Sequence, residues 1–264
     1  MRGRLAMLGL VLLAGLPVPG RAQAPAARVE GMWSDPPVTP DGLFCFFACT
    51  DPGLARLNAL LDDPANDTRP FQELQGEAKR FEREHLRDLL APAARTQYPL
   101  DPADDPGFLR CEPWGMVRQI FAPHQLEIRR RGATLELRYG EWDGLRTVYF
   151  DGRKPGTTPT PMGHSLGRWE GETLVVESSN IAANLIMLPD LQAMGQHSAQ
   201  MRVVERFTRS ADGRALHLVA TLTDPQTFRE PVKYRKIWRW APEQQIAPYD
   251  ACERPTDFRK GVGR

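Results

Sequence analysis

The sequence lacks the features that mark a nucleic-acid-binding, membrane-spanning, metal or cofactor protein. Its 264 residues include 34 Lys and Arg against 33 Asp and Glu, so no basic excess would attract nucleic acid or an anionic membrane surface. After the first residues, no apolar run approaches the roughly 20 residues that a membrane-spanning helix needs. Tight metal-ligand spacings such as H-x-H or H-E-x-x-H are missing, and so are nucleotide and haem motifs. We therefore expect no nucleic-acid partner, no membrane span, no metal and no cofactor.

Residues 1–24 have the pattern of a signal peptide. Arg2 and Arg4 precede an apolar run from Leu5 to Leu16, and Ala22-Gln23-Ala24 is a small-x-small cleavage site. The run is too short for a retained membrane anchor. We expect cleavage after Ala24 and a periplasmic or secreted location. Removing the three arginines of this segment leaves 31 basic against 33 acidic residues.

Cysteine is scarce, with four residues in the chain: Cys45, Cys49, Cys111 and Cys252. Four cysteines in an exported chain are typical of two disulfides, and three pairings are open. The simplest pairing joins Cys45 to Cys49 in a tight local loop and Cys111 to Cys252 across a long one. In the loop-closure model, the long loop is worth roughly 4–5 kcal/mol. Neither pair has a histidine or a second close cysteine pair beside it, which disfavours a zinc site.

Residues 25–107 are expected to form an extended arm and two helices packed on the main body. Residues 25–50 are rich in Pro and Gly without a clear period and form the arm. A short helix opens at Asp51-Pro52, and a second helix follows with Thr68 or Asp67 as its cap. The apolar residues of the second helix recur at spacings of three and four and predict one apolar stripe. The stripe consists of Phe71, Leu74, Ala78, Phe81, His85 and Leu89.

Residues 108–264 show the period-two alternation of β-strands. Turns of the X-Gly type join alternating runs at Arg131-Gly132, Glu170-Gly171 and Asp212-Gly213. The pattern predicts about eight to ten short strands and no helix after residue 110, and strands in that number usually close to remove their edges. The predicted fold is mainly β: an antiparallel β-barrel, lipocalin-like or a similar meander, with an N-terminal amphipathic helical segment.

One stretch matches a catalytic motif. Gly163-His164-Ser165-Leu166-Gly167 fits G-x-S-x-G, the turn that presents the nucleophilic serine of lipases and esterases. That turn needs a buried strand before the serine and a helix after it. Here the proline-containing segment KPGTTPTPM precedes it, and residues 167–171 turn into a strand. We interpret the match as coincidence and keep a serine esterase using Ser165 as an alternative hypothesis.

A series of short motifs resembles a family of secreted, β-rich proteins of Gram-negative bacteria with no established chemistry. The longest block, GHSLGRWEGETLVVE at 163–177, fits the family pattern GHS-x-GRWEG-[DE]-TLVV. The other motifs are Cys111-x-Pro113-x-Gly115-Met116, Asp151-Gly152-Arg153, His197-Ser198, VVERFTR at 203–209, Thr223-Asp224-Pro225 and Tyr249-x-x-Cys252. The resemblance covers roughly residues 108–253. It supports the pairing of Cys111 with Cys252, because both ends of the pattern carry a cysteine.

The chain departs from this family pattern in three places. Lys154 stands where the pattern has a histidine, and Ala199 stands where an acid commonly follows His-Ser. The segment SSNIAANLIM at 178–187 lacks the polar and aromatic residues of the pattern. If the family has a polar site at these positions, this chain has an altered one.

The candidate site residues are polar and aromatic side chains of the barrel region. Glu205 shares a strand face with Val203 and Phe207, and an inward carboxylate must be paired, so Arg153 or Arg168 is its expected partner. Two histidines and a carboxylate suit acid/base chemistry near neutral pH, and the predicted catalytic residues are His164, His197 and Glu205. The predicted ligand-binding residues are Asp151, Arg153, Ser165, Arg168, Trp169, Glu170 and Trp238. The competing interpretation is a structural Glu–Arg pair with histidines that cap loops.

These observations favour an exported barrel that holds a small apolar or aromatic molecule in its interior. Aromatic walls with a few polar groups are typical of small-molecule cavities. An enzymatic version would use cofactor-free acid/base chemistry of the isomerase or lyase type. The alternatives are the serine esterase and a non-catalytic envelope protein that binds a partner protein through residues 25–91.

Overall fold

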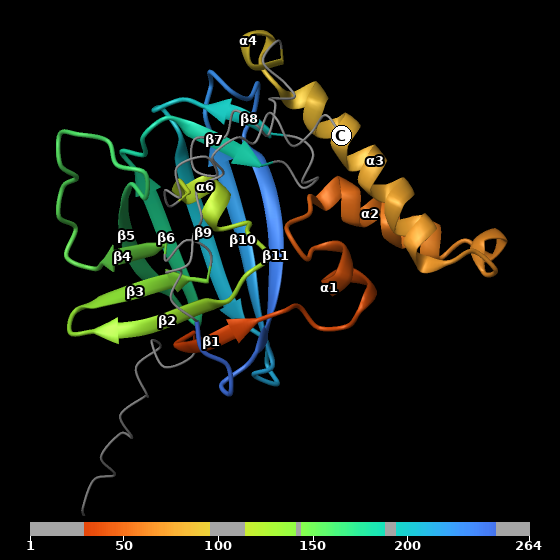
Figure 1. The fold of residues 1–264 in the computed structure, drawn as a ribbon, viewed down its shortest axis with the longest axis horizontal. Helices are drawn as coiled ribbons and strands as arrows, with labels where there is room; N and C mark the ends of the chain where they lie inside the picture. The colour runs from red at the N-terminus through yellow and green to blue at the C-terminus, as the bar shows by residue number, and fades with distance from the viewer. Residues whose placement is uncertain (1–28, 96–113, 141–143, 188–193, 247–264) are drawn as a thin grey trace, which may run out of the picture.

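The computed structural model describes residues 29–95, 114–140, 144–187 and 194–246, which are built around a closed β-barrel (Figure 1). Nine strands close in the order β1-β11-β10-β9-β6-β5-β4-β3-β2, and β7 and β8 form a separate two-stranded sheet. The strands are β1 (Gly31–Ser34), β2 (Leu126–Arg131), β3 (Thr134–Tyr139), β4 (Leu145–Tyr149), β5 (His164–Glu170), β6 (Thr173–Ser179), β7 (Asn184–Met187), β8 (Met194–His197), β9 (Arg202–Arg209), β10 (Ala215–Thr223) and β11 (Val232–Trp240). The predicted fold class, a mainly β barrel, is confirmed.

The hairpins follow from local sequence. β2 pairs with β3, β5 with β6, and β9 with β10, each antiparallel and each across one of the predicted X-Gly turns. Gly171 and Gly213 have φ of 60° and 74°, a left-handed backbone that glycine adopts without a steric penalty. Alternation then sends Val203, Glu205 and Phe207 of β9 inward, and all three are buried.

Two features differ from the predicted antiparallel meander. β1 comes from the predicted arm and completes the barrel, since Trp33 pairs with Trp240 of β11 and with Leu126 of β2. The barrel therefore does not begin at residue 108. β4 and β5 run parallel, through Val148–Ser165 and Tyr149–Leu166. Residues 150–163 form a long crossover instead of a hairpin, so the chain enters β5 in the direction of β4.

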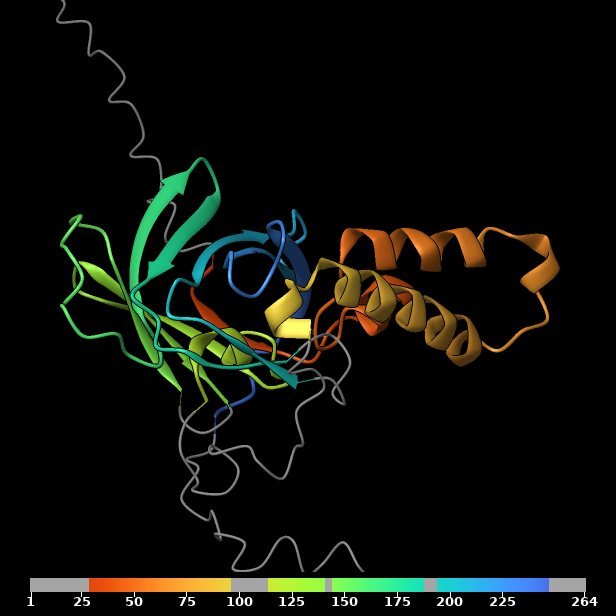
Figure 2. The ribbon, with the colours of Figure 1, turned by 90° about the horizontal axis from the view of Figure 1, so that it is seen from above.

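The helices preceding the barrel region lie on one side, next to β11 (Figures 1 and 2). They are α1 (Pro40–Phe44), α2 (Asp51–Leu61), the 3-10 helix η2 (Pro64–Asn66), α3 (Phe71–Leu89) and α4 (Pro92–Arg95). A further short helix, α6 (Met116–Gln119), occurs where no helix was expected, and it packs into the barrel core. Within the described ranges, no helix is both long and apolar enough to cross a membrane.

α3 buries a row of residues four apart, Leu74, Ala78, Glu82 and Leu86. Leu74 and Ala78 pack against Leu57 and Leu60 of α2, whereas Leu86 joins the barrel core. Figure 2 shows the two helices side by side, extending away from the barrel. Phe81, predicted in the apolar stripe, is 43% exposed, and Pro70 takes the cap position instead of Thr68 or Asp67. Glu82 occupies the buried position because its carboxylate accepts the Thr50 N–H at the start of α2 and pairs with Lys79 at 2.8 Å.

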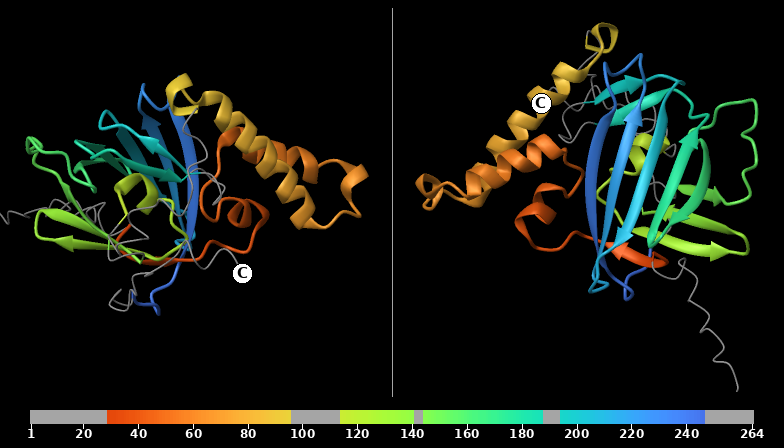
Figure 3. Two further views of the ribbon diagram at one scale, coloured as in Figure 1. Left: turned by 45° about the horizontal axis from the view of Figure 1, so that its top comes forward. Right: turned by 180° about the vertical axis from the view of Figure 1, so that it is seen from behind.

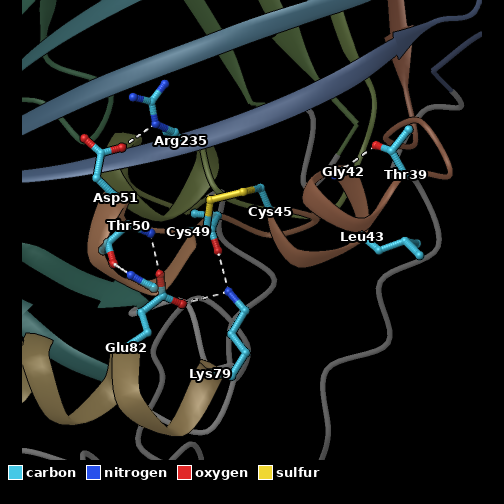
Figure 4. The surroundings of a disulfide bond; sticks show 12 residues. Thr39, Gly42, Leu43, Cys45, Cys49, Thr50, Asp51, Lys79, Glu82 and Arg235 are labelled. Atoms are coloured by element: carbon cyan, nitrogen blue, oxygen red, sulfur yellow. Dashed lines mark hydrogen bonds and ion pairs between the residues drawn. A yellow bond between two sulfur atoms is a disulfide. The ribbon is translucent and has the colours of Figure 1, made fainter. Parts of the chain in front are cut away.

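The Cys45–Cys49 disulfide is confirmed, with the Cα atoms 4.7 Å apart (Figure 4). The backbone of Cys49 exchanges two hydrogen bonds with Arg235 of β11, at 2.9 and 2.6 Å. Asp51, at the start of α2, forms an ion pair with the Arg235 side chain. This short loop therefore connects the helices to the barrel wall. The other predicted pair, Cys111 and Cys252, lies outside the described residues, as does the predicted signal peptide at 1–24.

Apolar side chains fill much of the described barrel. Inward-facing residues of β2, β3, β6, β9 and β10 form one buried cluster together with Met116 and Val117 of α6 and with Ile120 and Phe121. The long strands β9, β10 and β11 form a continuous wall, seen from behind in Figure 3. Two recesses, of about 470 and 760 Å³, lie where connections between elements meet.

Candidate functional site

A recess of about 760 Å³ lies beside α4, the end of β8 and the connection from β10 to β11. We call it the end recess. Most of its wall consists of small apolar side chains, and its polar groups come from the end of β8, the residue that follows it and the β10–β11 connection. The lining residues are Ala91, Pro92, Ala93, Ala94, Ala183, Gln196, His197, Ser198, Ala199, Pro225, Gln226 and Thr227.

Backbone pairing joins two walls of the end recess that are far apart in sequence. Leu90, just after α3, forms an isolated antiparallel bridge with Phe228. The Ala91 N–H donates to the Thr227 carbonyl at 2.9 Å, and the Arg229 N–H donates to the Leu89 carbonyl at 2.8 Å. The end of α3 is therefore fixed against the β10–β11 connection, and the wall that follows Leu90 has a defined position.

Asp224 organises the polar side of the recess. Its carboxylate accepts the Ser198 N–H at 2.6 Å, the Ser198 hydroxyl at 2.8 Å, the Thr227 hydroxyl at 2.6 Å and the Gln226 N–H at 3.1 Å. Burial alone would raise the pKa of Asp224, but the hydrogen bonds from Thr227 and Ser198 hold it below its ordinary value. Asp224 is thus a charged anchor that shapes both turns, and it is itself almost fully buried.

His197 is the most informative polar group in the wall. Its ring is 2% exposed, and Nδ1 lies 3.0 Å from the Ser198 carbonyl oxygen. A carbonyl only accepts, so Nδ1 carries the hydrogen and Nε2 carries the lone pair. Nε2 is buried and has no hydrogen-bond partner among the described residues. Burial lowers the pKa of His197, and the Ser198 carbonyl and the Asp224 charge offset this only in part. The ring is therefore neutral near pH 7.

A second polar cluster lies inside the barrel. Arg146 of β4 binds Glu205 of β9 through two hydrogen bonds, at 2.5 and 2.9 Å, and donates to the Tyr139 hydroxyl at 2.9 Å. Both charged side chains are at most 1% exposed. Burial alone would lower the pKa of Arg146, but Glu205 raises it above its ordinary value, so the ion pair persists. The predicted pairing of Glu205 with Arg153 or Arg168 is wrong, because Arg146 occupies that place.

Lys236 of β11 is a further buried charged side chain. It is 2% exposed, donates to the Ala122 carbonyl, and lies with Nζ 4.9 Å from the centre of the Trp238 ring. No carboxylate of the described residues forms an ion pair with it. Burial lowers the pKa of Lys236 to about 7.

The structure does not gather His164, His197 and Glu205 in one cavity. His164 pairs in register with Ser179, whose side chain points outward, while Glu205 pairs with Val176, which points inward. On the outer side, His164 Nε2 lies 2.9 Å from the Arg153 carbonyl oxygen, and its ring stacks on Tyr149. Of the three, His197 alone lines the end recess. The predicted three-residue catalytic set is therefore not assembled.

Ser165 is not presented to a substrate. It is 1% exposed, lies inside strand β5, and its hydroxyl shares a 2.8 Å hydrogen bond with Ser178. No helix follows it, since β5 continues to Glu170 and turns into β6. The strand–serine–helix geometry of an esterase is thus missing at this serine.

The remaining predicted ligand-binding residues divide between the outer surface and the core. Arg168 and Glu170 form an exposed ion-pair network with Glu177 and Arg206. Asp151 and Arg153 pair in an exposed turn, where Arg153 lowers the pKa of Asp151 to about 2. Trp169 is half-buried against the barrel core, and Trp238 is buried and donates to the His124 carbonyl at 3.3 Å. None of the six lines the end recess.

The sequence carried signals for the groups that were missed. Arg146 lies two residues from Val148, and Lys236 lies two residues from both Tyr234 and Trp238. Residues two apart share a strand face, so each charged side chain is on an inward face with buried residues. Asp224 belongs to one of the motifs of the family resemblance. In the described part of the chain, no group of three or more His, Cys, Asp and Glu side chains is placed to hold a metal ion.

Comparison with known proteins assigns no family to this chain. No family model and no curated protein matches this chain. Among solved structures, a crystal structure of a point mutant of the fluorescent protein UnaG is similar to 42% of this chain and 69% of its own, with 15% sequence identity and a TM-score of 0.24. The fold assignment therefore rests on the strand pairing of this chain.

Proposed function

We propose that this chain is an exported β-barrel protein that binds a small, largely apolar or aromatic molecule in the end recess. The observation that carries the proposal concerns His197, which lines this recess and whose Nε2 is buried without a hydrogen-bond partner among the described residues. Small-molecule sites are typically concavities of about 300–1,000 Å³ with apolar walls and a few placed polar groups. A buried acceptor without a donor costs free energy, which a ligand would recover.

The family resemblance supports this location. The His197-Ser198 motif and the Thr223-Asp224-Pro225 motif are separate in sequence, and the hydrogen bonds from Ser198 to Asp224 join them at the end recess. Ala199, where the family pattern commonly has an acid, lines the same wall. We propose that the chain is a member of that family in which this position has become apolar, which suits an uncharged ligand.

A second candidate function, cofactor-free acid/base catalysis, is favoured by the imidazole ring of His197. The Ser198 carbonyl fixes the tautomer of His197, and a neutral imidazole with a bare Nε2 can accept a proton from a bound substrate. Glu205 takes no part in this version, because it is committed to Arg146 inside the barrel. The base would be His197 alone.

Binding is tested by thermal shift and tryptophan fluorescence with a panel of toluene, ethylbenzene, 4-ethylphenol, indole and naphthalene. Ala199→Trp would fill the recess and should abolish the response. Ala133→Trp is the matched control, because Ala133 is exposed in the β2–β3 turn and does not line the recess. Failure of every compound to stabilise the protein, or an equal response in Ala199→Trp, would remove the proposal.

A further inference from the structure

The hydroxyl groups in the wall of the end recess have already used their hydrogens. Ser198 Oγ and Thr227 Oγ1 both donate to the carboxylate of Asp224, at 2.8 and 2.6 Å. A hydroxyl has one hydrogen and two lone pairs, so each of these oxygens is an acceptor toward anything else. Ser198 Oγ already accepts the Gln200 N–H at 3.0 Å, which leaves it one lone pair, and Thr227 Oγ1 also lies 3.4 Å from the Gln196 carbonyl oxygen. Asp224 keeps its charge at neutral pH and below, because the pKa of its carboxyl lies under the ordinary value. The two hydrogens therefore stay committed.

His197 adds a third acceptor. Nδ1–H is committed to the Ser198 carbonyl, which leaves the lone pair of Nε2 without a donor in the described structure. Burial disfavours the protonated ring, so Nε2 does not become a donor near neutral pH. Hydroxyls and a neutral histidine can usually donate or accept a hydrogen bond. Here the free positions of these groups can only accept one.

Among the residues that the structure describes, no charged side chain lines the end recess. Asp224 stands behind the wall with its carboxylate accepting four hydrogen bonds. The amides of Gln196 and Gln226 are exposed and can serve a ligand in either role. The remaining lining consists of alanine and proline. The wall thus offers an apolar surface with acceptors fixed at one side.

We propose that the end recess selects uncharged ligands that carry a hydrogen-bond donor on a small apolar body: phenols, alcohols or N–H heterocycles. The inference rests on the proposed function, because it names the ligand class of the same recess. Carboxylates are disfavoured, since the described part of the wall has no cation to pair with them and its fixed groups would repel them. Ethers are disfavoured because they bring no hydrogen for Nε2 of His197.

The test compares probes that differ in the donor alone. 4-Ethylphenol and 4-methylanisole are isomers, and indole and benzofuran have nearly the same shape. A single hydrogen bond of ordinary net strength predicts about tenfold tighter binding of the donor member of each pair, measured by calorimetry. 4-Methylbenzoate should bind more weakly than either isomer. In His197→Phe, which keeps an aromatic ring and loses the acceptor, the preference should shrink.

A spectroscopic readout on the unmodified protein keeps the test independent of how the variant folds. In ¹⁵N-histidine-labelled protein, Nε2 of His197 should give the resonance of an unprotonated nitrogen, and 4-ethylphenol should shift it while 4-methylanisole leaves it in place. Equal affinity within each pair, or tightest binding of 4-methylbenzoate, would overturn the inference and leave the proposed function standing. Binding by none of the probes would instead remove the proposed function.

Discussion

Lys236 allows a quantitative test of the barrel interior. Its pKa is lowered by burial from an ordinary value of 10.5 to about 7, so between these pH values the folded chain releases a proton that the unfolded chain retains. Stability then rises with pH, because proton release accompanies folding. At 1.36 kcal/mol for each pH unit, the difference between 10.5 and 7 corresponds to about 5 kcal/mol.

Replacing the amine isolates this contribution. Lys236→Met removes the buried ammonium and keeps most of the side-chain volume, at the cost of the hydrogen bond to the Ala122 carbonyl, about 1 kcal/mol. The variant should be more stable than the parent by several kcal/mol at pH 6. Between pH 7 and 9.5 the difference should shrink by about 3 kcal/mol. Urea unfolding followed by tryptophan fluorescence at pH 6, 7, 8, 9 and 9.5 measures it.

Subtracting the parent's free energy of unfolding from that of Lys236→Met at each pH cancels the contributions of the other titrating groups. Lys233→Met on the same strand is the control, because Lys233 is exposed on the outer face. It should change stability little, and equally at every pH. If the difference in free energy of unfolding between Lys236→Met and the parent stays constant from pH 6 to 9.5, the assignment of Lys236 as a buried amine without an ion-pair partner is wrong.

Three further variants test the other structural assignments. Glu205→Gln leaves the Arg146 charge buried without its partner and should cost about 3–5 kcal/mol in urea unfolding, while the combined Arg146→Met and Glu205→Leu change should cost less; a double variant as unstable as the single one would contradict this. Cys45→Ala with Cys49→Ala opens a five-residue loop and should lower the free energy of unfolding by about 2 kcal/mol, and an unchanged urea midpoint would show that the disulfide does not constrain the loop.

The sequence by itself determined three hairpins of the barrel. The alternating runs around Gly132, Gly171 and Gly213 reappear as β2–β3, β5–β6 and β9–β10, because a hairpin is encoded within a short stretch by its period and its turn. The alternation along β9 also predicted that Glu205 faces inward and needs a cation as its partner. The barrel class follows from the number of such strands.

Contacts between distant segments were decided by the tertiary structure alone. Strand alternation could not choose Arg146 over Arg153 or Arg168, because a contact across a barrel depends on how the strands are staggered. β1 closes the barrel although the sequence around Trp33 has no clear period. The end recess exists because the segment after α3, the end of β8 and the β10–β11 connection meet in space. Local patterns determine which face of a strand is buried, and the closure of the whole chain determines what each buried group meets there.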